Sequence, residues 1–125
     1  GQSIVSVRQF DRFLLHQLFN LAHDMRLFLQ RGSLDILRGA VLGTIFYEPS
    51  TRTSCSFQAA MQRLGGTVVA VSEMQNSSVA KGETLEDFVR VMERYCDVVV
   101  LRHPEQGAVQ RAASCMRRPV INAGD

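Results

Sequence analysis

Hydrophobic positions along this chain follow two spacings that alternate. Four stretches place apolar residues along one side of a helix: residues 11–30, 51–64, 84–95 and 106–116. Four short, nearly continuous apolar runs, typical of strands buried on both faces, occupy 41–46, 68–71, 97–101 and 119–122. Because strands alternate with helices, the pattern predicts an α/β fold. We expect a three-layer sandwich in which a four-stranded parallel sheet is flanked by helices.

The first predicted helix carries signals at both of its ends. Asp11 can cap its first turn, and Gly32 can end it. The apolar stripes of the four helices are interpreted as core rather than as a cofactor site. Residues 72–82 form a polar segment and are predicted to be a loop.

Length and composition describe one ordinary domain. The chain has 125 residues, of which 46% are hydrophobic and 21% charged, so it is neither a disordered tail nor a collagen-like chain. A formal net charge of +2 is too small for a nucleic-acid partner bound through bulk charge. No apolar run reaches the roughly 20 residues of a membrane span, and residues 1–4 do not resemble the start of a signal peptide. Gly1 in place of a Met is compatible with a domain cut from a longer chain.

The three cysteines indicate a reducing, cytoplasmic location. Cys55, Cys96 and Cys115 are odd in number and lack the spacing of metal ligands. We therefore expect no metal site, and we interpret the three side chains as small buried hydrophobes.

Polar residues follow each predicted strand, at the edge of a parallel sheet where ligands bind. The four tips are residues 47–53, 72–73, 102–104 and 122–125. Ser50, Thr51, Arg52 and Thr53 join a buried strand directly to the start of a helix, whose free N–H groups attract anions. The alternative is an ordinary helix cap beside a solvated arginine. A cap needs one hydroxyl rather than three around an arginine, so an anion site is slightly favoured.

Four segments of the chain resemble the aspartate and ornithine carbamoyltransferases. Residues 46–53, with the letters FYEPSTRT, are similar to the carbamoyl-phosphate signature of that family. Residues 77–84 resemble the mobile loop of the aspartate enzymes, and residues 99–104 and 120–125 resemble two further family segments. Within the family, the chain looks most like the aspartate carbamoyltransferase domain of the eukaryotic multifunctional pyrimidine-synthesis protein.

The resemblance implies a reaction in de novo pyrimidine biosynthesis. A carbamoyl group passes from carbamoyl phosphate to L-aspartate, giving N-carbamoyl-L-aspartate and phosphate, without a cofactor or metal. By resemblance, the phosphate is held by Ser50, Thr51, Arg52 and Thr53. Arg52 also stabilises charge on the leaving phosphate, while Thr53 and Arg102 polarise the carbamoyl oxygen, so the expected catalytic residues are Arg52, Thr53 and Arg102.

Alternatives remain open for the residues around this site. Arg102 could simply pair with an acid such as Glu105. His103 is interpreted as a turn residue packed before Pro104, without a catalytic role. Glu48 is the residue type of the aspartate enzymes, in which it bridges two domains, and it is not placed among the catalytic residues.

The resemblance also implies an assembly of several copies. The family's mobile loop reaches the active site of the adjacent subunit, so Ser78 and Lys81 would act in trans within a homotrimer. Many family members have an arginine directly after the signature, whereas this chain has Ser54, as the eukaryotic aspartate enzymes do.

Two parts of the family pattern have no counterpart in residues 1–125. A His-Pro-Thr-Gln segment is expected shortly after Asp125, and the aspartate-binding domain after that. We therefore interpret residues 1–125 as a carbamoyl-phosphate-binding domain that lacks its last helix, with L-aspartate bound by the missing second domain. We expect no meaningful catalysis from this piece alone, and an apolar patch where the helix would lie. The alternative is a non-enzymatic α/β module that binds an anion or serves assembly.

Overall fold

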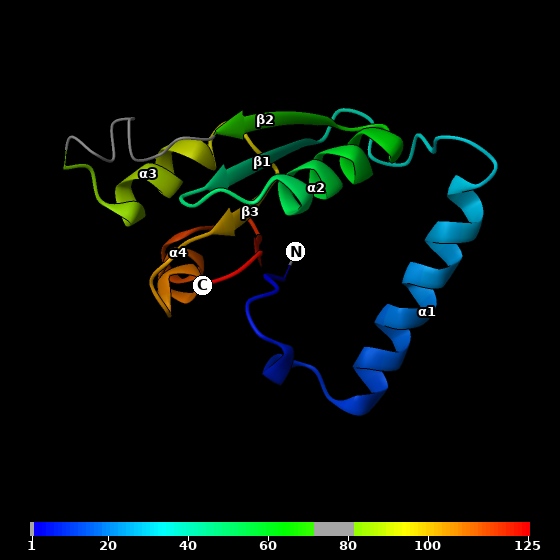
Figure 1. The fold of residues 1–125 in the computed structure, drawn as a ribbon, viewed down its shortest axis with the longest axis horizontal. Coiled ribbons are helices and arrows are strands. Elements are labelled where there is room, and N and C mark those ends of the chain that lie inside the picture. The colour runs from blue at the N-terminus through cyan, green and yellow to red at the C-terminus, as the bar shows by residue number, and fades with distance from the viewer. Residues whose placement is uncertain (1, 72–81) are drawn as a thin grey trace.

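A computed structural model describes residues 2–71 and 82–125 of the chain (Figure 1). The helices are α1 (Arg12–Leu29), α2 (Thr51–Arg63), α3 (Leu85–Met92) and α4 (Ala108–Cys115), with a short 3-10 helix η1 at Val7–Gln9. The strands are β1 (Val41–Phe46), β2 (Thr67–Val71), β3 (Val98–Arg102) and β4 (Val120–Asn122). The predicted α/β class and order of elements are confirmed, with bounds that differ by a few residues.

The four strands form one parallel sheet in the order β2-β1-β3-β4. The two central strands are buried: β1 is covered along nearly its whole length, and Val99, Val100 and Leu101 of β3 are fully buried. In contrast, β2 lies at the edge, and Val69 is 40% exposed. The prediction that the run 68–71 is buried on both faces is therefore wrong, because an edge strand is covered less than a central one.

The helices cover the sheet from both faces, as predicted for three layers. Met61 of α2 packs with Leu42, Phe46 and Val100 on one face. On the other face α3 and α4 pack side by side over a larger cluster. That cluster includes Ile45, Leu85, Val89, Met92, Val99, Leu101, Val109, Ala112 and Val120.

The N-terminal segment runs beside β4 and covers that edge. The backbone N–H of Ile4 donates to the carbonyl of Val120 at 2.9 Å, and the N–H of Asn122 donates to the carbonyl of Ile4 at 2.8 Å. The hydroxyl of Ser3 accepts from the N–H of Val120 at 2.9 Å. Residues far apart in sequence thus protect hydrogen-bonding groups that an edge strand leaves open.

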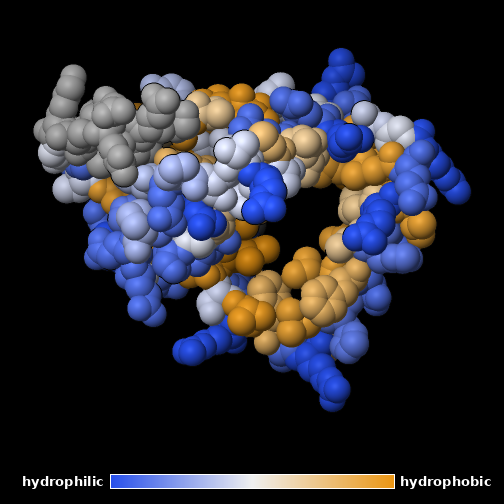
Figure 2. All heavy atoms as spheres, in the orientation of Figure 1, coloured by the Kyte–Doolittle hydropathy of each residue, from blue (hydrophilic) through white to orange (hydrophobic). Residues whose placement is uncertain are grey.

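Helix α1 stands away from the sheet, along one side of the molecule (Figure 1). Its ends follow the sequence signals, because the Asp11 carboxylate accepts from the N–H of Leu14 at 2.8 Å and Gly32 has a φ of +120°. None of its 18 residues is buried, and Phe13 is 68% exposed. The interpretation of its apolar stripe as core is therefore wrong for this chain. In Figure 2 apolar side chains surround the hollow between α1 and the body of the domain.

The cysteines differ from one another in burial. Cys96 is buried beneath the sheet, Cys115 is half-buried and Cys55 is exposed, and all three are free thiols. The expectation of three buried hydrophobes is confirmed for Cys96 and wrong for Cys55. Across residues 2–71 and 82–125, no helix combines the length and apolar character that crossing a membrane requires.

Candidate functional site

The candidate site lies where the chain reverses its direction across the sheet. From β1 the chain passes to β2 on one side, and it then returns past β1 to β3 on the other side. The connections that leave β1 and β3 therefore run to opposite sides. Such switch points are where open α/β sheets bind ligands. Phe46 is in register with Arg102, and the N–H of Tyr47 donates to the carbonyl of Arg102 at 2.9 Å. The two predicted tips are thus held side by side.

The segment from Ser50 to Thr53 forms the start of α2. Ser50 is the N-cap residue, and its carbonyl accepts from the N–H of Ser54 at 2.9 Å. Its hydroxyl makes no capping hydrogen bond, and the first turn of the helix contains no acidic residue. The first N–H groups of a helix have no partner within it and carry partial positive charge. The hydroxyl that an ordinary cap would use is therefore left available.

The four side chains of this segment differ in exposure. Arg52 and Thr51 are exposed, while Ser50 and Thr53 are half-buried. Within the described part of the chain, Arg52 forms no ion pair. A guanidinium and a helix N-terminus at one strand tip supply the charge and the donors that a phosphate group requires.

Arg102 is held from two sides at the end of β3. Its Nε donates to Oε1 of Glu48 at 3.1 Å, and its Nη1 donates to the carbonyl of Ala123 at 3.0 Å. The alternative partner Glu105 instead accepts from Nη1 of Arg111 at 2.8 Å. The pairing of Arg102 with Glu105 is therefore wrong. The register of the sheet brings Glu48, 54 residues away in sequence, into contact with Arg102. Glu105, which is near Arg102 in sequence, bonds to another arginine.

Tyr47 and His103 directly follow β1 and β3, and their rings lie close to each other. Their rings lie 4.6 Å apart at 53°. Burial, aided by the negative charges of Glu83 and Glu86, raises the pKa of Tyr47 to about 12, and its hydroxyl has no partner among the described residues. Burial also lowers the pKa of His103. Both rings are therefore held in their neutral forms near pH 7, in agreement with a packing role for His103.

Two residues that the sequence analysis placed at a strand tip without a role also belong to this edge. Asn122 and Asp125 hydrogen-bond to each other at 3.1 Å in the turn that follows β4. Ala123, which accepts from Arg102, lies between them. Their place at a strand tip was the available signal, but their hydrogen bonds depend on the fold.

The remaining predicted site residues, Ser78 and Lys81, lie outside the described residues. In residues 2–71 and 82–125, no three His, Cys, Asp or Glu side chains are grouped as metal ligands.

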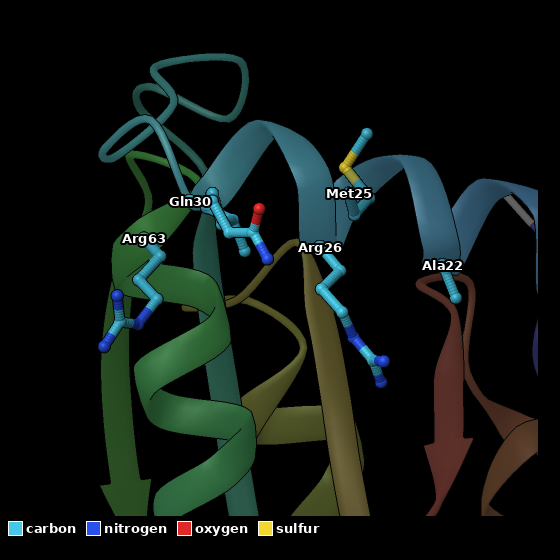
Figure 3. A pocket seen from close by; sticks show the side chains of 6 residues that line it. Ala22, Met25, Arg26, Gln30 and Arg63 are labelled. Carbon is cyan, nitrogen blue, oxygen red and sulfur yellow. The ribbon is translucent and has the colours of Figure 1, made fainter.

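Two surface hollows lie at the opposite end of the sheet from the strand tips. One, of about 510 Å³, is bordered by α1 and by Arg63 at the far end of α2 (Figure 3). In Figure 3 Met25 and Arg26 project from α1, and Gln30 lies just after its last residue. The other, also of about 510 Å³, lies beside the C-terminal ends of α3 and α4. Neither hollow includes a predicted site residue.

Fold and site together define a class of protein: a parallel α/β domain with an uncapped helix start and a fixed arginine at its switch point. Residues 2–125 match the family described as "Aspartate/ornithine carbamoyltransferase, carbamoyl-P binding domain". The chain belongs to this family.

Known proteins resemble the chain over its whole length. It is 59% identical to the multifunctional protein CAD of Squalus acanthias over 126 aligned residues, covering 100% of this chain and 6% of that protein. It is 49% identical to the aspartate carbamoyltransferase catalytic subunit of Thermoplasma acidophilum, covering 100% of this chain and 41% of that subunit.

A solved structure resembles the chain in both fold and sequence. The aspartate transcarbamoylase of Trypanosoma cruzi, crystallised with carbamoyl phosphate and aspartate, is similar with a TM-score of 0.91 and 43% identity. The match covers 100% of this chain and 41% of that enzyme. The chain thus spans less than half the length of these relatives.

Proposed function

We propose that this chain binds carbamoyl phosphate at the tips of β1 and β3, as the first part of an aspartate carbamoyltransferase. The observation that carries the proposal is the helix start at Ser50–Thr53 with its uncommitted cap hydroxyl, beside an anchored Arg102. The family match and the resemblance to an enzyme crystallised with carbamoyl phosphate support the same ligand.

Carbamoyl transfer requires residues that position the substrate and stabilise the charge that develops during the reaction. In carbamoyl transfer, the amine of aspartate attacks the carbonyl carbon, a C–N bond forms, and the C–O bond to phosphate breaks. The phosphate leaves with the bonding electron pair and takes up the proton that the amine gives up. Negative charge therefore grows on the carbonyl oxygen and on the bridging oxygen, and fixed donors stabilise it.

Each side chain has a role that follows from its place. Ser50 and Thr51 bind phosphate oxygens with the N–H groups of the first helical turn. Arg52 binds the phosphate through its planar fork of donors and stabilises the leaving group. Thr53 and Arg102 donate to the carbamoyl oxygen, and Arg102 does so through guanidinium N–H groups that Glu48 and the carbonyl of Ala123 do not occupy.

The complete reaction requires parts that residues 1–125 do not supply. Aspartate is bound by a second domain, and a His-Pro-Thr-Gln segment completes the carbamoyl site. Ser78 and Lys81 act in trans in a homotrimer, a proposal that rests on the sequence resemblance alone. We place the parent enzyme in the cytoplasm, in the pyrimidine pathway.

Titration of phosphate and of carbamoyl phosphate into the 125-residue chain tests the proposal. We expect Arg52→Ala to weaken binding at least tenfold, because a charge-assisted contact is lost. Arg63→Ala is the matched control, since it removes an arginine from the other end of the same helix and leaves binding unchanged. Failure of both ligands to bind the unaltered chain, or equal binding by Arg52→Ala, would overturn the proposal.

Without the missing parts, the chain does not form N-carbamoyl-aspartate at a meaningful rate. A turnover assay with both substrates checks this directly. Turnover like that of a complete carbamoyltransferase would show that these residues suffice.

A further inference from the structure

The turn after β4 is tied to three neighbouring parts of the fold. The N–H of Ala123 donates to the carbonyl of Leu101 at 2.9 Å, and the N–H of His103 donates to the carbonyl of Gly124 at 2.8 Å. These two bonds hold the turn against the end of β3 on either side of Arg102. The position of the Ala123 carbonyl is therefore fixed. This carbonyl accepts a hydrogen bond from Nη1 of Arg102 at 3.0 Å.

Asn122 gives this turn its shape from within. Its Oδ1 accepts from the N–H of Gly124 at 2.7 Å, and its Nδ2 donates to the carbonyl of Val5 at 2.9 Å. Gly124 has a φ of +132°, in the region that favours glycine. A Cβ at this position would lie 3.0 Å from Nη1 of Arg102, so the turn leaves just enough space for the guanidinium.

Asp125 fastens the turn from outside. One carboxylate oxygen, Oδ1, accepts from Nδ2 of Asn122 at 3.1 Å. The other, Oδ2, accepts from the N–H of Gly107 at 3.1 Å and from that of Val109 at 3.2 Å, at the start of α4. The partial positive charge at the start of a helix attracts a carboxylate, so this contact stabilises the position of Asp125.

We propose that Asn122 and Asp125 are positioning residues that hold the guanidinium of Arg102 in the orientation needed for the carbamoyl oxygen. The inference rests on the proposed function of Arg102 and adds two residues to it. Asp125 fixes Asn122, Asn122 fixes the peptide of Gly124, and the neighbouring carbonyl of Ala123 selects the conformation of Arg102. Neither positioning side chain is required to touch the ligand.

The expected effect of breaking this chain of contacts is loss of order at Arg102. In Asp125→Ala, the Nε–H signal of Arg102 in a ¹⁵N NMR spectrum should broaden or move toward that of a free arginine. Affinity for carbamoyl phosphate should fall about tenfold, the cost of one hydrogen bond to a charged group. Affinity for inorganic phosphate, which has no carbamoyl oxygen, should change little. Asp125→Asn keeps one acceptor oxygen and should show a smaller change, and it serves if the alanine variant is unstable.

Two comparisons separate positioning from a general loss of stability. Glu93→Ala is the matched control, because Glu93 also accepts two backbone N–H groups, those of Arg117 and Arg118 at 2.8 and 3.1 Å, at the other end of the sheet. It should leave the Arg102 signal and both affinities unchanged. In an Arg102→Ala background, Asp125→Ala should weaken binding no further, since a residue that acts through Arg102 has nothing left to position.

Three results decide between the claims. Unchanged affinity for carbamoyl phosphate and an unchanged Arg102 signal in Asp125→Ala would overturn the inference, as would the same loss of affinity in both backgrounds. If the unaltered chain binds neither ligand, the proposed function fails. The Arg102 signal in Asp125→Ala then decides the positioning claim by itself.

Discussion

Nε of Arg102 lies 3.1 Å from Oε1 of Glu48, so an ion pair joins the end of β3 to the loop after β1. The two side chains are 30% and 38% exposed, which places the pair at the surface of the site rather than in the core. The carboxylate occupies the Nε donor of Arg102, which an anionic ligand could otherwise use. Glu48 therefore competes with the proposed ligand for the same guanidinium.

Glu48→Gln is expected to tighten phosphate binding several-fold. The substitution removes a negative charge beside an anion site and keeps a similar side-chain shape, so both repulsion and competition decrease. The gain should shrink as salt is added, because an exposed pair is screened. Phosphate titrations at about 0.05 and 0.5 M salt measure both effects.

Glu105→Gln is the control for this result. It makes the same chemical change in the loop after β3, but Glu105 pairs with Arg111 and leaves Arg102 untouched. Its phosphate affinity should stay close to that of the unaltered chain. Weaker binding by Glu48→Gln would mean instead that the carboxylate orients Arg102 for the ligand.

Gly43, in the middle of β1, touches the sulfur of Cys96. A Cβ added to Gly43 would lie 2.6 Å from Sγ, far inside contact distance, while the Cβ of Cys96 would lie 3.5 Å away. Gly43→Ala should therefore lower the free energy of unfolding by about 1–3 kcal/mol, the usual cost of overfilling a core. Urea denaturation gives this value.

Removal of the opposing sulfur should rescue the variant. Gly43→Ala with Cys96→Ala exchanges one buried atom for another, so the double variant should be more stable than Gly43→Ala alone. Cys96→Ala by itself should cost about 1 kcal/mol through the cavity it leaves. Additive losses would show that the alanine at 43 meets an obstacle other than Cys96.

Local spacing predicted the sheet and the strand tips because each depends on residues near in sequence. The alternation of apolar runs and helical stripes requires crossovers, and these bring Ser50–Thr53 and Arg102 to one edge. The partner of Arg102 was not predictable, since Glu48 reaches it only through the register of β1 with β3. Asn122 and Asp125 were missed for the same reason. The roles of Ser78 and Lys81 stay predictions.

The apolar stripe of α1 shows where periodicity stops being informative. Spacing identifies a helix with an apolar side, but it does not say which surface that side contacts. In this chain no residue of the stripe is buried, and Phe13 and Leu21 are each more than half accessible. The run of apolar residues in β2 likewise did not predict that this strand lies at the edge of the sheet.

Because α1 buries none of its residues, polar substitution there should cost little. Phe13→Gln, at a position 68% exposed, should change the free energy of unfolding by no more than about 0.5 kcal/mol. Val89→Ala in α3, at a fully buried position, should cost about 2 kcal/mol. Urea denaturation of both variants checks the contrast. A large loss in Phe13→Gln would mean that α1 packs against the domain in solution.

The stability of the chain should depend on pH through His103. Burial, the largest cause, lowers the pKa of its ring below the ordinary 6.5, with a smaller contribution from the charge of Arg111. Nδ1 of the ring also accepts from the N–H of Glu105 at 3.0 Å, a bond that an added proton on Nδ1 would break. As pH falls below about 6.5, the unfolded chain therefore binds a proton before the folded chain does. The stabilisation is complete above that pH and is lost as pH falls through the folded pKa.

His103→Asn keeps an acceptor near the position of Nδ1 and removes the titration. Urea denaturation from pH 8 to pH 5 should show the unaltered chain losing stability relative to this variant at the acid end. The other titrating groups are present in both chains, so their effects cancel in the difference between the two curves. Parallel curves would mean that the ring takes up its proton equally well in the folded and unfolded chains. A difference of opposite sign would mean that Glu48, Glu105 and Asp125, whose charges favour the protonated ring, outweigh its burial.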